Sequence, residues 1–553
     1  MGLLDWIFLG LFLLGLVGII VWVIVKGDKD TTDYFLAGRD ATWLAIGASI
    51  FASNIGSEHL VGLAGAGAQS GMAMAHWEMQ GWIILLLGWL FVPFYARSKV
   101  FTMPEFLEKR YNSQSRSFLS IISLVSYILT KVAVTVYAGG VVFKDVFNIE
   151  AIKVAGYSID FFWVSAVGLV ILTGLYTTFG GMKAVLYTSV LQTPILLIGS
   201  IMVLVIGLIK LGGWNEMIEI CRSHVTQFGD PMTSLIRSSK DPEFPWTGVI
   251  LGSAIIGFWY WCTDQFIVQR VLSGRDQKQA RRGAIFGAYL KLTPVFIFLI
   301  PGMIAYALSQ KGIITLRSSD AAFSTLVRVL LPVGFKGIIV GGILAALMSS
   351  LASLFNSSAT LFTVDFYKKY RPNATEKHYV RVGRIATVVI VVLGILWIPV
   401  MKSLGQVLYA YLQDVQSLLA PGIAAVFLLG IISKKTTPQA GFYGLLIGFV
   451  LGMTRLGLRI FEGSLDQSGM IYKVFIAPNW LHYEIVLFFI VIAAMIIIST
   501  FTERMNPDKI KGFIMGSATP EQKAETRASW DKWDVINSTV IIVIIVAFYI
   551  YFW

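Results

Sequence analysis

Ala52-Ser-Asn-Ile-Gly-Ser-Glu-His59 is a polar stretch inside an apolar segment that runs from residue 41 to residue 62. Gly56 weakens a helix, and Ser53 and Asn54 offer the backbone hydrogen bonds that compete with helical ones. A second interruption, Trp259-Tyr-Trp-Cys-Thr-Asp-Gln265, lies in the apolar segment 247–270. Polar breaks at corresponding places in two halves of a membrane protein point to a transport site, although small residues also serve close helix packing. The pattern predicts two broken helices with a binding site between them.

The rest of the chain is as apolar as these two segments. Apolar residues make up 56% of the 553 positions and charged residues 14%, against about 25% charged in soluble domains. Apolar runs of about 20 residues span a bilayer as helices. We therefore predict an all-α integral membrane protein with about 14 transmembrane helices, at 6–26, 41–62, 72–95, 117–148, 160–179, 184–208, 247–270, 279–309, 333–364, 383–402, 407–431, 438–458, 483–503 and 534–552.

The order of these helices suggests a repeat. Helix 247–270 follows helix 41–62 by five helices, so the two should cross the membrane in opposite directions, as in an inverted repeat. We expect a single transporter domain over 1–553. Its parts would be an extra N-terminal helix at 6–26, a first five-helix repeat at 41–208, a second at 247–431, and C-terminal flanking helices at 438–553.

The basic residues predict the orientation. Of the 44 Lys and Arg residues, 28 fall in the segments at one set of alternate helix ends, and 14 fall on the opposite side. Cytoplasmic loops carry the excess of basic residues, so both termini are expected outside the cytoplasm. The protein is expected in the plasma membrane, or in the inner membrane of a bacterium. No basic cluster indicates nucleic-acid binding, and the oligomeric state stays open.

Several polar side chains stand within predicted helices, namely Glu78, Lys131, Lys291 and Gln413. Such residues are costly in a bilayer and by default mark function. Together they supply the donors and acceptors that a polyhydroxylated ligand needs, and neighbouring aromatic rings suit the apolar face of a sugar. Two structural alternatives stay open: Glu78 and Lys291 form a pair that only joins helices, and Lys131 extends to the membrane interface. His76 is expected to be a hydrogen-bonded interfacial histidine.

Helix 333–364 carries a candidate ion site in Ala345-Ala346-Leu-Met-Ser349-Ser350. Sodium prefers several neutral oxygens, which paired hydroxyls can supply together with carbonyls freed where a helix unwinds. The alternative is a packing face of small residues. No phosphate loop, metal-type Cys/His spacing or nucleophile elbow is present in the sequence. The protein is therefore not expected to be an enzyme, and an ion gradient or the solute's own gradient must drive transport.

At these residues the chain resembles the sodium/glucose cotransporter family, also called the solute:sodium symporters. The similarity covers nearly the whole chain. It rests on Asp33-Tyr-Phe-Leu-Ala-Gly-Arg39, Ala48-Ser-Ile-Phe-Ala-Ser-Asn-Ile-Gly-Ser57, Thr102-Met-Pro-Glu-Phe-Leu107, Gly180-Gly-Met-Lys-Ala-Val185, Trp259-Tyr-Trp-Cys-Thr-Asp-Gln265, Ile267-Val-Gln-Arg270, Ser349-Ser-Leu-Ala-Ser353 and Ala424-Ala-Val-Phe-Leu-Leu429.

The resemblance implies a LeuT-type five-plus-five repeat and sodium-coupled import of a glucose- or galactose-like monosaccharide by alternating access. It implies sodium ligands at Ala52, Ile55, Ala346, Ser349 and Ser350. It implies sugar contacts at Asn54, His59, Glu78, Trp261, Lys291 and Gln413. Tyr260 would form the inner gate, and Leu63, Trp77 and Tyr409 the outer lid. Lys131 matches a polar position near the sugar, and Asp264 is a possible addition.

One departure from the family pattern concerns the ion. Relatives typically have an acidic residue in the sixth helix where this chain has Ser189, in Tyr187-Thr188-Ser189. We therefore expect one sodium ion for each sugar. Other solutes remain as alternatives, namely inositol, sialic acid or another small organic molecule, although Glu78 argues against an anion bound beside it. A channel or a transport-like sensor on the same fold is a further alternative.

Overall fold

The structure, a computed structural model, describes residues 2–56, 58–154, 157–404, 408–506 and 508–553, without the side chains of residues 129, 154, 400–404 and 408–414. In these ranges eleven helical stretches are long and apolar enough to cross a membrane. They are Leu3–Lys26, Gly71–Ser98, Ser113–Phe147, Phe161–Leu211, Gln277–Gln310, Phe335–Tyr370, Glu376–Pro399, Val415–Ile432, Pro438–Ile460, Trp480–Phe501 and Lys532–Tyr551. The predicted count of fourteen therefore stays a prediction.

The difference in number has a structural origin. The predicted helices 41–62 and 247–270 are both broken, so neither forms one long helix. The predicted helices 160–179 and 184–208 join in α11 (Phe161–Leu211), in which Gly181 interrupts the helical backbone with φ 51° and ψ −147°. A Cβ at Gly181 would collide with the carbonyl oxygen of Tyr34, so the chain turns there only with glycine.

The first half of the chain builds its helices around the first break. After α1 (Leu3–Lys26) and α2 (Thr31–Leu36), α3 (Trp43–Asn54) ends at the break, and a π-helical turn at Glu58–Leu63 leads into α4 (Ala64–Gln69). The segments that follow are α5 (Ala75–Glu78), α6 (Gly81–Leu86), α7 (Val92–Ser98), α8 (Met103–Arg110), α9 (Ser113–Ser126), α10 (Ala133–Phe147), the antiparallel strands β1 (Ala151–Val154) and β2 (Tyr157–Asp160), α11, and α12 (Trp214–Ser223).

The second half contains the other break, which follows its π-helical turn instead of preceding it. There α13 (Trp246–Phe258) runs into a π-helical turn at Trp259–Thr263, and α14 (Gln265–Leu272) starts after the second break. The remaining helices are α15 (Gln277–Lys291), α16 (Ile300–Gln310), α17 (Ala322–Leu330), α18 (Phe335–Thr360), α19 (Lys368–Tyr370), α20 (Glu376–Leu404), α21 (Leu408–Ile432), α22 (Pro438–Ile460), α23 (Trp480–Phe501), α24 (Pro520–Ala528) and α25 (Lys532–Tyr551).

The two breaks have nearly the same backbone geometry. Ile55 closes α3 with φ −77° and ψ 108°, and Asp264 precedes α14 with φ −76° and ψ 127°. Ile55 precedes the π-helical turn at Glu58–Leu63, and Asp264 directly follows the π-helical turn at Trp259–Thr263. Because α3 packs on α11, α15 and α18, the first break lies inside the bundle.

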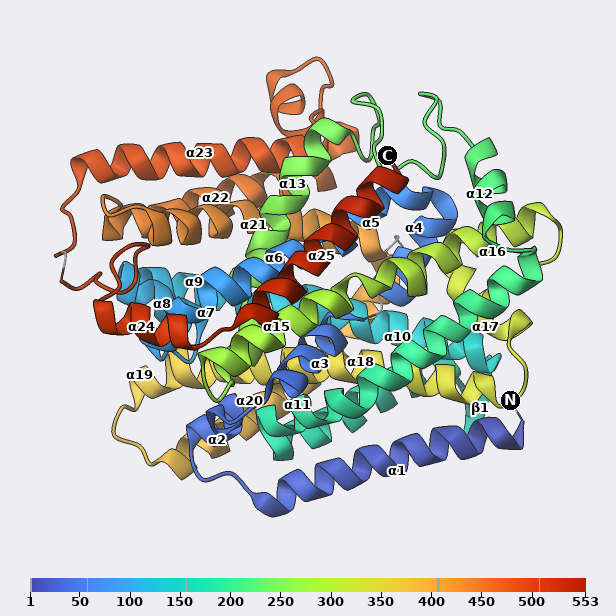
Figure 1. The fold of residues 1–553 in the computed structure, drawn as a ribbon, viewed down its shortest axis with the longest axis horizontal. Helices are drawn as coiled ribbons and strands as arrows, with labels where there is room; N and C mark the ends of the chain where they lie inside the picture. Colours follow the sequence, from blue (N-terminus) through green and yellow to red (C-terminus); the bar gives the residue numbers. More distant parts are fainter. Residues whose placement is uncertain (1, 57, 155–156, 405–407, 507) are drawn as a thin grey trace.

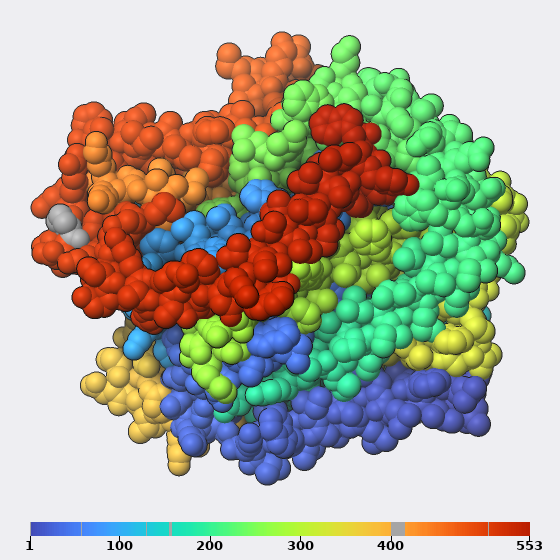
Figure 2. Space-filling view, viewed as in Figure 1, coloured from blue at the N-terminus to red at the C-terminus, as the bar shows by residue number. Residues whose placement is uncertain are grey.

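The outer helices present their apolar side chains to the surroundings. Leu11 on α1, Ile497 on α23 and Val543 on α25 are all exposed, as lipid-facing residues are. Figure 1 shows α1 along one edge of the bundle and α23 along the opposite edge. Figure 2 shows α25, in red, lying obliquely across the face of the molecule. Helices outside the repeats therefore cover part of the bundle.

Candidate functional site

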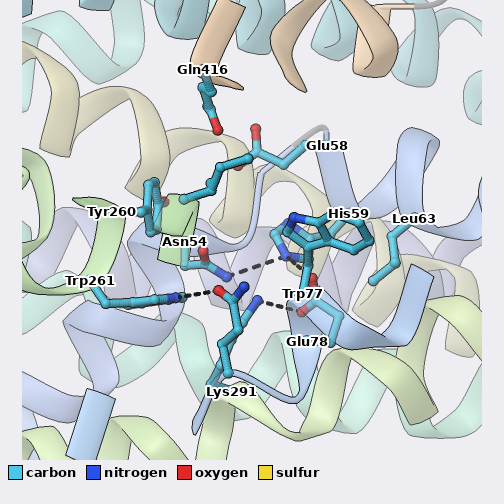
Figure 3. Close-up of a pocket in the computed structure, with 12 residues that line it drawn as sticks. Asn54, Glu58, His59, Leu63, Trp77, Glu78, Tyr260, Trp261, Lys291 and Gln416 are labelled. Atoms are coloured by element: carbon cyan, nitrogen blue, oxygen red, sulfur yellow. Dashed lines mark hydrogen bonds and ion pairs between the residues drawn. The ribbon is translucent and has the colours of Figure 1, made fainter. Parts of the chain in front are cut away.

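A cavity of about 60 Å³ lies beside the first break. It has room for a few waters at roughly 10–15 Å³ each, well below the roughly 300–1,000 Å³ of pockets that hold a small molecule. Its walls come from both broken helices and from α5, α15 and α21 (Figure 3). The lining residues are Asn54, Glu58, His59, Leu63, Trp77, Glu78, Gln80, Ile256, Tyr260, Trp261, Lys291 and Gln416.

Glu78 is the centre of a buried polar network in this cavity. Nζ of Lys291 lies 2.6 Å from Oε2 of Glu78, and Nε2 of His59 lies 3.4 Å from Oε1. Nδ2 of Asn54 lies 3.3 Å from the same nitrogen of His59. Nδ1 of His59 is buried and has no hydrogen-bond partner in the part of the chain that the structure describes. The structure thus brings together four predicted sugar-binding residues, and Nδ1 of His59 is the ring nitrogen that none of them engages.

The aromatic wall of the cavity is fixed by hydrogen bonds. Nε1 of Trp261 donates to Oε1 of Gln80 at 3.1 Å, and Nε2 of Gln80 donates to the carbonyl oxygen of Ser253 at 2.8 Å. The ring of Tyr260 packs edge-on against that of Trp261, with centroids 4.9 Å apart. Trp261 therefore has a defined orientation, with Nζ of Lys291 5.3 Å from the centroid of its ring.

One residue of the predicted outer lid packs against a helix of the C-terminal part. Trp77 is 5% exposed and stacks on Trp480 of α23, with ring centroids 5.8 Å apart. Leu63 is buried beside the cavity. The side chains of Tyr409 and Gln413, predicted for the lid and the sugar contacts, lie outside the described residues.

His76, directly before Trp77, does not line the cavity. Its Nδ1 lies 2.7 Å from the hydroxyl of Tyr549 on α25, and its Nε2 lies 2.9 Å from the carbonyl oxygen of Leu235. Because a carbonyl only accepts, Nε2 donates the proton and Nδ1 accepts from Tyr549. Both ring nitrogens are thus engaged by protein groups, in keeping with the predicted structural role.

Lys131 and Asp264 form an ion pair next to the cavity. Nζ of Lys131 lies 2.7 Å from Oδ2 of Asp264, and the hydroxyl of Tyr127 also donates to this carboxylate. Asp264 caps α14 by accepting from the backbone N–H of Phe266. Lys131 is 7% exposed, and its Nζ lies 4.8 Å from the ring centroid of Tyr260. The lysine therefore does not extend to the membrane interface but supports the ring predicted as the inner gate.

The predicted sodium residues come together where α18 meets the break of α3. Oγ of Ser350 donates to the carbonyl oxygen of Ser53 at 3.0 Å. Ala52 and Ile55 lie at the end of α3, where helical carbonyls lose their intrahelical partners. Ala346 lies one turn before Ser350 on α18. Hydroxyls and freed carbonyls are the neutral oxygens that a hard cation binds, so the donor set fits sodium.

Four cavity residues were not among the predicted contacts: Glu58, Gln80, Ile256 and Gln416. Glu58 and Gln80 were visible in the sequence as polar residues within apolar segments. Gln416 follows Gln413 by three positions, a spacing that places two residues on one helix face. Ile256 carried no signal, because one apolar residue in an apolar helix is not distinctive.

Comparison with known proteins identifies the relatives of this chain. A model of the sodium:solute symporter family matches residues 34–448. The human sodium/myo-inositol cotransporter 2 is 36% identical over 529 residues, covering 90% of this chain and 77% of its own. The sodium/glucose cotransporter 1 of Ovis aries is 37% identical over 518 residues, covering 87% and 76%.

Two solved structures share the fold. A Na⁺-coupled sialic acid symporter in a substrate-bound outward-open state has a TM-score of 0.76 at 20% identity, covering 91% of this chain and 99% of its own. A nucleobase-cation-symport-1 family transporter in a closed conformation has a TM-score of 0.53 at 12% identity, covering 88% and 99%. The predicted LeuT-type fold class is confirmed by these similarities.

Proposed function

Because this chain belongs to the sodium:solute symporter family, we propose that the solute it carries with sodium is a monosaccharide of the glucose or galactose type. It is a multi-pass membrane transporter and not an enzyme. Sodium moving down its gradient would drive import of the sugar by alternating access. The cavity beside the first break would be the sugar-binding site.

The observation that carries this proposal is the Lys291–Glu78–His59 network facing Trp261 and Tyr260 in one cavity. The hydroxyls of a sugar both donate and accept, so they can bond to the carboxylate, the ammonium and the free ring nitrogen of His59. The aromatic rings suit the apolar face of a pyranose. Gln413 and Asn54 would add amide contacts.

The small volume of the cavity implies that its walls move. A sugar enters only if Trp77, Leu63 and Tyr409 separate on one side, and it leaves only if Tyr260 swings away on the other. Sodium bound by Ala52, Ile55, Ala346, Ser349 and Ser350 would hold the break of α3 against α18 and favour the outward-open form, because it binds that form more tightly. At about 100 mV, inside negative, each inward charge adds roughly 2.3 kcal/mol of driving force.

Myo-inositol is the second candidate solute. The human sodium/myo-inositol cotransporter 2 is nearly as similar to this chain as the Ovis aries sodium/glucose cotransporter 1, and a ring of hydroxyls would satisfy the same network. A sialic acid is less suited because Glu78 and Glu58 both line the cavity. A channel would conduct solute without saturation, and a sensor would bind solute without taking it up.

The proposal also includes the orientation of the chain in the membrane and its division into two repeats. Both termini would lie outside the cytoplasm, with repeats at 41–208 and 247–431 and the C-terminal helices at 438–553 flanking them. The excess of Lys and Arg at one set of helix ends supports this orientation. The plasma membrane, or the inner membrane of a bacterium, is the expected location.

Uptake into proteoliposomes tests the proposal. Labelled glucose, galactose, mannose and myo-inositol are compared with and without an inward sodium gradient. We expect saturable, sodium-dependent uptake of glucose or galactose. Preferential uptake of myo-inositol would select the second candidate, and uptake that neither saturates nor responds to sodium would contradict the transport mechanism.

A further inference from the structure

Glu58 is the cavity residue whose charge is not balanced. Its carboxylate lines the cavity but makes no hydrogen bond or ion pair with any residue that the structure describes. The two lysines nearby are engaged elsewhere, Lys291 with Glu78 and Lys131 with Asp264. The carboxylate of Glu58 therefore has no direct partner among the described residues and is available to a group that the cavity receives.

Its position places it between the candidate ion site and the candidate solute site. A Cβ added at Gly56 would lie 3.1 Å from Oγ of Ser350 and 3.5 Å from Oε2 of Glu58. Figure 3 shows Glu58 reaching into the cavity on the side of Gln416 and Tyr260, away from the Glu78–Lys291 pair. The carboxylate is thus presented to the solute on a different wall from the polar network.

We propose that the solute carries a protonated amine, as an amino sugar does, and that Glu58 binds this group. This inference rests on the proposed function of the cavity as the sugar site. With Glu78 paired to Lys291, Glu58 adds a negative charge to the cavity, and an unpaired carboxylate is costly in a site with room for only a few waters. An ammonium group forms a charge-assisted hydrogen bond with it, whereas a neutral sugar offers only hydroxyls.

The aromatic lining favours an organic cation over a bare ion. Tyr260, Trp261 and Trp77 all line the cavity, and aromatic faces attract ammonium groups. Sodium has its own set of neutral oxygens at the α3 break. The same surplus charge repels carboxylate-bearing sugars, so Glu58 would select against anions as well as for amines.

The test compares three sugars in proteoliposomes of the full chain with an inward sodium gradient. They are labelled glucosamine, labelled glucose, and N-acetylglucosamine as the matched neutral derivative. The assay is run at about pH 6.5, below the roughly 7.7–8.0 pKa of an α-amino group. We expect a half-saturating concentration for glucosamine about tenfold lower than for either neutral sugar.

Glu58→Gln should remove this preference, so that the half-saturating concentrations of glucosamine and of the neutral sugars become about equal. Glu484→Gln, which changes a buried glutamate of α23 that does not line the cavity, should leave the tenfold preference in place. Equal half-saturating concentrations of the three sugars in the unchanged protein would overturn the inference. A different result is that Glu58→Gln changes the sodium Hill coefficient or the pH dependence of uptake while the preference for glucosamine stays the same. That result would also overturn the inference, because it would assign Glu58 to the binding of sodium or a proton. Absence of sodium-dependent uptake of all three would instead contradict the proposed function.

Discussion

The hydroxyl oxygen of Ser189 on α11 lies 3.3 Å from that of Ser349 on α18. Ser189 also donates to the carbonyl oxygen of Val185 at 2.6 Å. A neutral hydroxyl thus stands beside a proposed sodium ligand at the position where relatives typically carry an acid. A second cation at this place would lack the negative charge that such a carboxylate provides.

We therefore expect a sodium Hill coefficient near one and one labelled sodium ion for each labelled glucose. Ser189→Asp places a carboxylate next to Ser349 and should raise the Hill coefficient toward two. Ser189→Ala is the control and should leave it near one. Two sodium ions for each glucose in the unchanged protein would contradict this prediction.

Ser350→Ala should weaken sodium binding. The substitution removes a hydroxyl that now reaches the carbonyl of Ser53 across the α3–α18 contact. We expect the half-saturating sodium concentration for uptake to rise by about tenfold, the effect of losing roughly 1.4 kcal/mol. Ser358→Ala is the matched control, because its buried hydroxyl on the same helix has no partner among the described residues. An unchanged sodium requirement would remove Ser350 from the site.

Asp264→Asn should destabilise the protein strongly. It leaves Lys131 buried without its 2.7 Å partner, and breaking one side of a buried ion pair costs about 3–5 kcal/mol. Thermal unfolding in detergent should show a lower Tm, which Lys131→Met in the same protein should partly restore. The exposed partner of Lys144 offers a control, since Glu150→Gln removes a surface ion pair and should change Tm little.

Tyr549→Phe should weaken solute binding although Tyr549 lies outside the cavity lining. It removes the hydrogen bond to Nδ1 of His76, the residue before Trp77. This hydrogen bond contributes roughly 0.5–1.5 kcal/mol to holding Trp77 in position. Its loss should raise the half-saturating sugar concentration several-fold and leave the sodium requirement unchanged. Tyr551→Phe, which removes a contact to Trp214, is the matched control. Equal effects of the two substitutions would indicate general destabilisation by changes in α25.

Glu484→Leu should stabilise the protein. Both carboxyl oxygens of Glu484 are buried without a hydrogen-bond partner in the described parts of the chain. Replacing an unsatisfied buried polar group by an apolar one of similar size should gain about 1–3 kcal/mol and raise Tm. A lower Tm, or loss of uptake with normal folding, would show that this carboxylate binds a proton or a cation during transport.

The sequence predicted the two breaks because glycine and short polar residues interrupt otherwise apolar helices. It left the Glu78–Lys291 pair as one alternative and did not predict the pairing of Lys131 with Asp264. Lys131 and Asp264 are 133 positions apart, and Lys291 and Glu78 are 213 apart, so only the packing of helices decides these partners. The short helices α12 and α24 were missed as well, since they carry no long apolar run and lie in segments predicted as loops.

The similar dihedral angles at Ile55 and Asp264 have a consequence for how such a transporter can change. Two of the five proposed sodium ligands, Ala52 and Ile55, are main-chain oxygens at the break of α3, and a main-chain oxygen can stay in place when a cavity side chain is substituted. The proposed solute, in contrast, would contact side chains that line the cavity, such as those of Glu58 and Gln416. One substitution in the wall can therefore exchange the transported molecule while the coupling ion stays the same. On this proposal, the specificity for the solute and the specificity for the ion depend on different groups of the protein, so the two can evolve at different speeds.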